Sequence, residues 1–145
     1  MKKSHMILGL ALGVLIVGLI AYSGSVNGQE KTPSISRLAV VWSSGDPEVA
    51  HRVCFMYTDN AKKKKWFDEV TLIVWGPSAR LLAGDQDLQA KIKAMLEDGI
   101  KVQACIACAD SYGVTEQLRK LGIEVKPMGQ PLTDLIKGGW HILTF

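Results

Sequence analysis

The segment RLAVVWSSGDPEV (residues 37–49) decides the fold class of this chain. Residues 37–43 form a continuous apolar run rich in valine, which is typical of a strand buried on both faces of a sheet. Asp46 can then cap the free amide groups of a helix, and Pro47 fits the first helical position, where a missing N–H costs nothing. A buried strand followed directly by a capped helix is the unit from which α/β domains are built.

The same alternation continues to the end of the sequence. Further strands are predicted at residues 70–76, 100–105, 123–128 and 140–145. Residues 77–99 begin with one short turn and continue as a helix that Asp85 caps. A third helix is predicted to begin near Thr115, because Gly113 interrupts the pattern and leaves 106–114 as a loop. A fourth helix is predicted over residues 131–139. Strands joined by crossover helices predict one three-layer α/β/α domain over residues 37–145, with a five-stranded, mainly parallel sheet.

The first predicted helix carries two adjoining stripes. Its larger apolar residues recur at helical spacing, and they are Val49, Val53, Met56 and Tyr57. The smaller ones are Ala50, Cys54 and Ala61. Small thiols on such a stripe are usually buried, so we predict that Cys54 is a packed core residue rather than a site residue.

Residues 1–28 have the layout of a secretory signal, because Lys2 and Lys3 precede an apolar run over residues 7–21 that small and polar residues follow. This predicts cleavage before Gln29, with residues 29–36 as a linker. The alternative is an uncleaved membrane anchor, although the run is short for a span of about 20 residues. In both cases the domain is expected outside the cytoplasm, periplasmic or membrane-anchored, and it would meet the membrane only through this N-terminal segment.

The charge of the chain argues against one class of partner. The formal net charge is +3, and removal of Lys2 and Lys3 with a signal segment that has no acidic residue leaves +1. Nucleic-acid binding takes much of its affinity from a strongly basic face, so we expect no nucleic-acid partner. Nucleotide-binding and hydrolase motifs such as the P-loop, G-x-G-x-x-G and G-x-S-x-G are absent from the sequence.

Ligands of open α/β sheets bind outside the carboxyl ends of the strands. Small turn residues and a methionine follow three of the predicted strands, and they are the candidate ligand-binding residues: Ser43, Ser44, Gly45, Gly76, Pro77, Ser78 and Met128. Glycine, proline and serine are also ordinary turn residues, so composition alone does not separate a site from a plain turn.

The third predicted strand differs, because the candidate catalytic residues Cys105 and Cys108 follow it. A thiol at a strand end that faces a helix N-terminus meets aligned peptide dipoles and N–H groups, which stabilise a thiolate. The spacing gives Cys105 that position and leaves Cys108 close enough to reach back.

Four interpretations of the cysteine pair are open. C-x-x-C in an α/β chain suggests a redox pair, although no Gly-Pro separates the cysteines. A zinc site would need His51 and His141 to converge on them, which their spacing does not support, so no metal is expected. A structural disulfide across so short a loop adds little stability. We rank a single working thiol, Cys105, first and the disulfide second.

Four stretches together resemble the DsrE/F-like group of sulfur-relay proteins: LAVVWSSGDPEVAHRVCFMY, TLIVWGPSARLLAG, IKVQACIACADSYGV and LGIEVKPMGQPLTDLIKGGWHILTF. The resemblance covers nearly all of residues 37–145, and the segment around Cys105 is its most specific part. It implies a compact five-stranded α/β/α domain that forms homo-oligomers, either trimers or hexamers.

In the sulfur-carrying members of that group, a cysteine after the strand equivalent to 100–105 accepts sulfur as a persulfide and hands it to a partner. Cys105 matches that position. The resemblance therefore implies a sulfur carrier or sulfurtransferase that uses a sulfur donor or acceptor protein and no metal or organic cofactor. Cys108, where relatives commonly have alanine, and the export segment are departures. The alternative is an exported, non-catalytic oligomeric module that binds a small ligand or partner and keeps the cysteines as a structural pair.

Overall fold

A parallel sheet forms the centre of the fold. The computed structural model describes residues 35–145. Its five strands are β1 (Arg37–Trp42), β2 (Glu69–Val74), β3 (Lys101–Cys105), β4 (Glu124–Lys126) and β5 (His141–Thr144). They lie in the order β4-β3-β2-β1-β5, and each neighbouring pair is parallel. The predicted five-stranded α/β sheet is confirmed.

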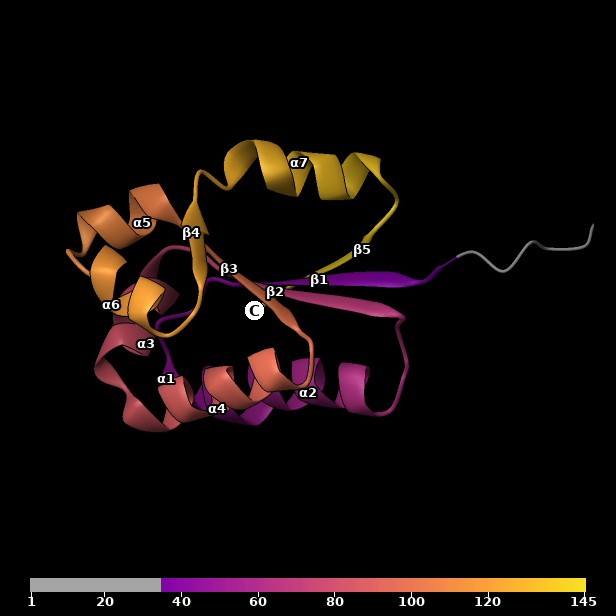
Figure 1. Cartoon of the computed structure of the whole chain (residues 1–145), viewed down its shortest axis with the longest axis horizontal. Helices are drawn as coiled ribbons and strands as arrows, with labels where there is room; N and C mark the ends of the chain where they lie inside the picture. Colours follow the sequence, from indigo (N-terminus) through magenta and orange to yellow (C-terminus); the bar gives the residue numbers. More distant parts are fainter. Residues whose placement is uncertain (1–34) are drawn as a thin grey trace, which may run out of the picture. The chain divides into compact units, whose positions relative to one another are not determined.

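Helices make every connection between these strands. They are α1 (Pro47–Val49), the π-helical turn η2 (Ala50–Cys54), α2 (Phe55–Lys63), α3 (Pro77–Gly84), α4 (Gln86–Glu97), α5 (Ile106–Ser111), α6 (Thr115–Lys120) and α7 (Gly129–Lys137). The first three connections step across the sheet in one direction, whereas the last returns to the far side of β1. Right-handed crossovers therefore place α7 on the opposite face from α2 and α4, as Figure 1 shows.

The predicted helix caps are present. Asp46 accepts a hydrogen bond from the Glu48 amide at 2.8 Å, and Pro47 is the first residue of α1. Asp85 accepts one from the Leu88 amide at 2.9 Å at the start of α4. Each cap satisfies an amide group that the first helical turn leaves without a partner, which typically stabilises a helix by about 1 kcal/mol.

Side chains of β1 alternate between two cores. Leu38, Val40 and Trp42 lie in the larger core under α2 and α4, where each is fully buried. Ala39 and Val41 lie in a smaller core on the other face, under α7. Alternation of this kind follows from the two-residue period of a strand and lets a continuous apolar run serve both faces.

The first helix buries its small residues. Ala50, Cys54 and Ala61 are fully buried, whereas Val53 is 43% and Met56 is 57% exposed. Cys54 is thus a core residue, as predicted, and of the larger stripe Tyr57 packs against the core while Val53 and Met56 lie at the surface. The buried small residues recur at ordinary helical spacing, so their stripe is the one that faces the sheet.

Two segments predicted to be turns are helices. Residues 77–84 form the whole of α3, which Pro77 begins, and residues 106–111 form α5. Gly113 adopts φ +67° and closes α5, with a hydrogen bond from the Val114 amide to the Ala109 carbonyl at 2.9 Å. The glycine therefore ends a helix that is already formed instead of preventing it.

The predicted signal or anchor segment lies outside the described residues, as does most of the predicted linker. Ser36, the last linker residue, donates two hydrogen bonds to the Asp68 carboxylate, from its amide at 2.7 Å and its hydroxyl at 3.0 Å. None of the helices between residues 35 and 145 is long and apolar enough to cross a bilayer.

Candidate functional site

The two candidate catalytic cysteines meet at the junction of β3 and α5. Cys105 is the last residue of β3 and the N-cap of α5, with an extended backbone (φ −72°, ψ 116°). Cys108 lies in the first turn of that helix. The Cys105 side chain is 6% exposed, and Cys108 is half-buried. Both are free thiols, and the more accessible of them is Cys108.

Apolar side chains surround the pair. Cys105 belongs to the smaller core together with Ile73 and Met128, and Cys108 packs against that core beside Trp75. Met128, which was a candidate ligand-binding residue, is only 1% exposed and forms part of this apolar wall. The thiols therefore lie where the buried apolar core meets the protein surface.

The pKa of Cys108 is raised above that of an ordinary thiol. Burial is the largest cause, because it disfavours the charged thiolate. The backbone N–H of Gly76 contacts Cys108 and lowers the pKa, whereas the neighbouring Cys105 thiol raises it further. Cys108 is therefore protonated at neutral pH, and its interaction with Cys105 shows that the two thiols are neighbours.

The third cysteine is chemically separate. Cys54 is fully buried in the larger core, on the other side of the sheet from the pair. Burial raises the pKa of Cys54 to about 12. A thiol that is both buried and protonated is inert, so Cys54 takes no part in the site.

The loop after β2 presents Gly76 to Cys108. Gly76 adopts φ 69° and ψ −137°, a conformation in which L-residues are strained. Ser78, which is fully buried, holds the loop in place: its hydroxyl donates to the Trp42 carbonyl at 2.6 Å and accepts from the Trp75 amide at 3.0 Å. The Ser78 hydroxyl, from a candidate ligand-binding residue, is thus already hydrogen-bonded to the backbone at the end of β1 and just after β2.

We expect Gly76→Ala to lower the free energy of unfolding by about 1–3 kcal/mol, because the new side chain must adopt a strained backbone conformation. A direct clash is not the cause, since the nearest atom to an added Cβ is the Ser43 carbonyl oxygen at 4.0 Å. Urea denaturation measures the change. Gly84→Ala is the control: no atom lies within 4 Å of its Cβ, and its φ is not positive. Equal losses in the two variants would contradict this explanation.

The loop after β1 is held by Phe145, the residue that follows β5. The amides of Ser43 and Ser44 donate to the Phe145 carbonyl oxygen at 2.7 and 3.1 Å, and the Ser43 hydroxyl donates to it at 2.9 Å. Gly45 follows, and a Cβ there would lie 3.1 Å from the Cβ of Pro77. The loops after β1 and β2 therefore touch, and only a residue without a side chain fits at Gly45 without displacement.

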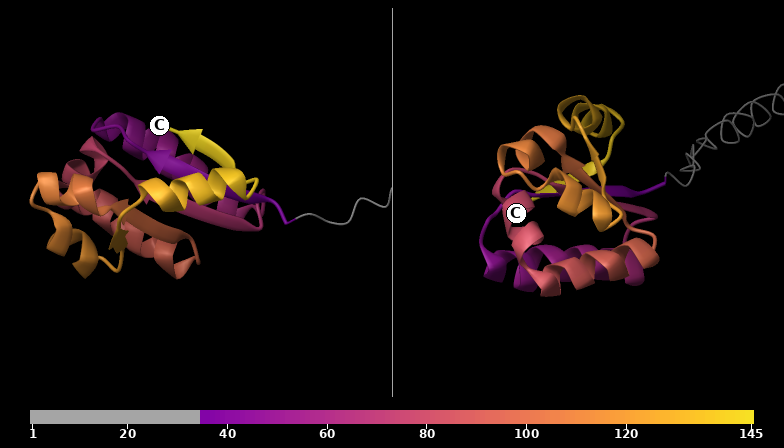
Figure 2. Two further views of the ribbon diagram at one scale, coloured as in Figure 1. Left: turned by 90° about the horizontal axis from the view of Figure 1, so that it is seen from above. Right: turned by 60° about the vertical axis from the view of Figure 1, so that its left-hand side comes forward.

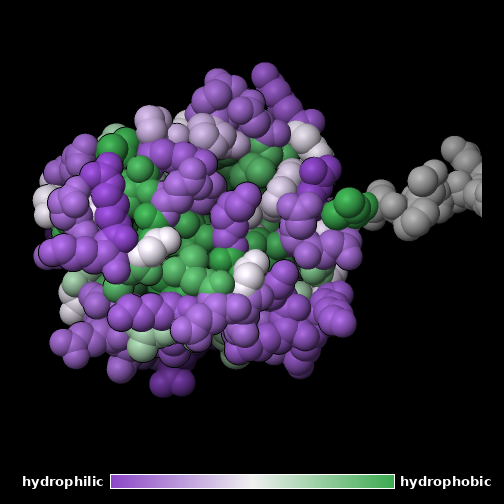
Figure 3. All heavy atoms as spheres, viewed as in Figure 1, coloured by the Kyte–Doolittle hydropathy of each residue, from purple (hydrophilic) through white to green (hydrophobic). Residues whose placement is uncertain are grey.

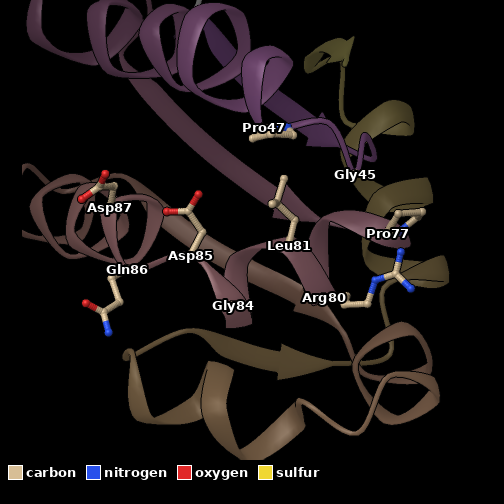
Figure 4. A pocket seen from close by; sticks show the side chains of 9 residues that line it. All are labelled: Gly45, Pro47, Pro77, Arg80, Leu81, Gly84, Asp85, Gln86 and Asp87. Atoms are coloured by element: carbon tan, nitrogen blue, oxygen red, sulfur yellow. The ribbon is translucent and has the colours of Figure 1, made fainter.

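A cavity of about 690 Å³ lies beside these two loops. Its lining consists of Gly45, Pro47, Pro77, Arg80, Leu81, Gly84, Asp85, Gln86 and Asp87. Figure 4 shows Leu81 pointing toward Pro47, whereas Gln86 points away from both. Sequence reasoning named Gly45 and Pro77 but missed Arg80 and Leu81, because it treated residues 77–84 as a turn and not as the helix α3. The cysteine pair is not among the lining residues.

A second cavity of about 590 Å³ lies between α2 and α4 and includes His51. His51 Nε2 is 3.5 Å from Asp85 Oδ2, and His51 Nδ1 is 3.0 Å from Lys91 Nζ. His141 packs on Phe67 with ring centroids 5.5 Å apart. Neither histidine joins the cysteines, and within residues 35–145 no three His, Cys, Asp or Glu side chains could hold a metal ion.

Comparisons with known proteins extend this description. The model of the DsrE/DsrF-like family matches residues 39–145. The structure of a conserved protein of unknown function, BT1422 from Bacteroides thetaiotaomicron, is 34% identical, with a TM-score of 0.73 over 76% of this chain and 95% of that one.

Two more distant structures share the fold alone. The ychN protein from E. coli is 14% identical, with a TM-score of 0.59 over 76% of this chain and 99% of that one. MTH1491 from Methanobacterium thermoautotrophicum, a protein of unknown function, is 13% identical, with a TM-score of 0.61 and the same coverage, 76% and 99%. A search among curated proteins found no match.

Proposed function

The chain belongs to the DsrE/DsrF-like family, and on that premise we propose that it is an exported sulfur carrier or sulfurtransferase in which Cys105 accepts a sulfane sulfur. The family is associated with sulfur relay. The observation that carries the proposal for this chain is the position of Cys105, which occupies the N-cap position of α5 at the end of β3, with an apolar core behind it. The amide groups of the first helical turn, which have no partner within the helix, lie next to this position.

The loading step needs a sulfane-sulfur donor, such as a small persulfide or a polysulfide. The Cys105 thiolate attacks the outer sulfur of the donor, the donor's S–S bond breaks, and the donor thiolate leaves with the bonding electron pair. Cys105 then carries a persulfide, and no metal or organic cofactor is required. Transfer to an acceptor repeats the same displacement in the opposite direction, with the acceptor thiolate as the attacking group.

Loading can be measured as intact mass after the reduced Cys108→Ser chain is exposed to polysulfide, with peptide mapping, because this variant keeps only Cys105 of the pair. We expect one added sulfur on Cys105 that a reductant removes. A chain that gains no sulfur, or gains it equally at Cys54, would contradict the proposal, because a buried, protonated thiol cannot react selectively.

Assembly into a homo-oligomer, as a trimer or hexamer, is the second part of the proposal. Its support is the face of the sheet that α7 covers. No residue of α7 is fully buried, Leu132 and Leu135 pack only partly on the smaller core, and Ile136 is 56% exposed. Figure 2 shows α7 lying across this face of the sheet. Hydrophobic residues also gather in the middle of the face seen in Figure 3, and contiguous apolar surface of this kind often marks an interface.

The third part of the proposal is export, with a sulfur donor or acceptor protein in the same compartment. Its support is the sequence of residues 1–28, with Lys2 and Lys3 ahead of an apolar run. The working domain would then lie in the periplasm or on the outer side of a membrane.

One observation favours the alternative of an exported binding module. The cavity of about 690 Å³ at the ends of β1 and β2 has the size of a small-ligand site, and neither cysteine lines it. Its lining mixes Arg80 with Asp85 and Asp87, so it does not select one charge of ligand. Under this alternative a Cys105→Ser variant keeps its ligand, whereas under the carrier proposal it loses its activity.

A further inference from the structure

We propose that the Cys105–Cys108 pair converts a stored persulfide into free sulfide, because Cys108 can displace hydrosulfide from sulfur-loaded Cys105 and leave a Cys105–Cys108 disulfide. The inference rests on the proposed function, since it begins with the persulfide on Cys105. It adds reductive sulfide release, an activity that a simple carrier with one cysteine does not have.

The positions of the two residues on α5 carry the inference. Cys105 is the N-cap, and Cys108 is the third residue of the helix that follows. Residues three apart on a helix have Cα atoms about 5 Å apart, which is inside the range of roughly 4.4–6.8 Å that disulfides bridge. Both side chains also pack in the same core, beside each other. The disulfide can therefore form with side-chain rotation and without a rearrangement of the backbone.

The sulfur atom that lies next to the Cys108 thiol determines which of the two persulfide sulfurs is attacked. In the unloaded protein the neighbour of the Cys108 thiol is Cys105 Sγ. After loading, this same atom is the inner sulfur of the persulfide, and the added sulfur extends beyond it. Attack on the outer sulfur would merely move the persulfide to Cys108, whereas attack on the neighbouring inner sulfur expels hydrosulfide, a good leaving group.

The step balances without an external oxidant or reductant. The Cys108 thiol loses its proton and attacks Cys105 Sγ, and the Cys105 Sγ–Cys108 Sγ bond forms. The bond from Cys105 Sγ to the added sulfur breaks, and hydrosulfide leaves with the electron pair and takes a proton. The sulfane sulfur is reduced to sulfide while the two cysteines are oxidised to the disulfide. A dithiol then restores the pair by thiol–disulfide exchange and becomes a disulfide itself.

The groups around Cys108 determine how the rate of sulfide release depends on pH. The polar groups that face it are the Gly76 N–H, from the loop after β2, and the Cys105 thiol on its own element. Burial raises the pKa of Cys108, so its thiolate is scarce at neutral pH. The attacking form is the thiolate, so sulfide release quickens as the pH rises.

A single-turnover experiment on the full chain tests the inference. The reduced protein is mixed, without oxygen, with one equivalent of a small organic persulfide, and free sulfide is measured against a buffer blank. We expect about one sulfide per chain, and a product two hydrogens lighter than the reduced protein whose peptide map joins Cys105 to Cys108. In Cys108→Ser we expect the added sulfur to stay on Cys105 and sulfide release to slow by at least ~10-fold. Cys54→Ala, a change in the other core, should behave like the unmodified chain.

The outcomes separate the two proposals. If the unmodified chain keeps its persulfide as long as Cys108→Ser does, the sulfide-release inference is wrong and the carrier function stands. If Cys108→Ser takes up no sulfur at all, the proposed loading of Cys105 is wrong. A disulfide that forms with no sulfide released would identify the pair as an ordinary redox couple and would also overturn the inference.

Discussion

Replacing Cys105 with serine is expected to abolish sulfur loading, reducing the added mass on the full chain to the background of a chain without donor. A hydroxyl is far less nucleophilic than a thiolate toward sulfur, so no other group at this position performs the displacement. The substitution removes one sulfur from a side chain that is 6% exposed, and serine is common at helix N-caps. The fold should therefore survive, which circular dichroism and a urea midpoint close to that of the unmodified chain would show.

The matched variant is Cys108→Ser, because the two cysteines share one helix and one core. It should load one sulfur per chain on Cys105 and keep it. Measurement of intact mass after treatment with polysulfide, on both variants in parallel, decides the matter. Equal loading in both would contradict the assignment of the sulfur to Cys105. Loading in Cys105→Ser and none in Cys108→Ser would make the more accessible Cys108 the acceptor.

The position of Cys105 could be predicted from sequence because it depends on local rules. A valine-rich run followed by a helix start fixes a strand end, and parallel strands bring their carboxyl ends to one edge of the sheet. The caps at Asp46 and Asp85 follow from the same short-range chemistry.

Features that depend on packing across the fold were less predictable. The sequence pattern of the first helix did not indicate that Val53 and Met56, on its larger stripe, lie at the surface. Ser43 and Ser78 have the composition of ligand-binding turns, yet their hydroxyls are bound to the backbone of Phe145 and Trp42. Those partners lie 102 and 36 residues away in the sequence, beyond what local composition can indicate.

Sequence also could not rank the two thiols by exposure. The sequence ranked Cys105 first because its spacing places it at the strand end, facing the start of a helix. The structure places Cys105 within the smaller core and Cys108 at its border, nearer the surface. This difference in exposure makes the two single-serine variants informative about the site.

Replacing Trp42 with alanine is expected to lower the free energy of unfolding by about 3–5 kcal/mol, the range for removing a large aromatic side chain from a core. Trp42 is fully buried at the end of β1 and packs edge-on against Phe55, with ring centroids 4.9 Å apart. A domain of this size is stable by only about 5–15 kcal/mol, so the variant should unfold at a much lower urea concentration.

A conservative variant tests the cause of that loss. The Trp42 indole N–H has no hydrogen-bond partner within the described part of the chain. Trp42→Phe keeps most of the ring and removes this unsatisfied donor, so it should lose clearly less stability than Trp42→Ala. If the two variants were equally destabilised, the packing of the ring would not be the main contribution.

Trp66 provides the matched control, because it is 49% exposed and its ring packs only at the surface, beside Tyr57 and Lys64. Trp66→Ala should lower the free energy of unfolding by less than about 1 kcal/mol.

Alkylation of Cys54 gives a second measurement, since this thiol is buried in the same core as Trp42 and reacts only when that core opens. We expect Cys54 to be alkylated much faster in Trp42→Ala and at an unchanged rate in Trp66→Ala, because only the first substitution leaves a cavity under α2. Rapid alkylation of Cys54 in the unmodified chain would show instead that the larger core opens without any mutation, and the stability assigned to Trp42 would then be too high.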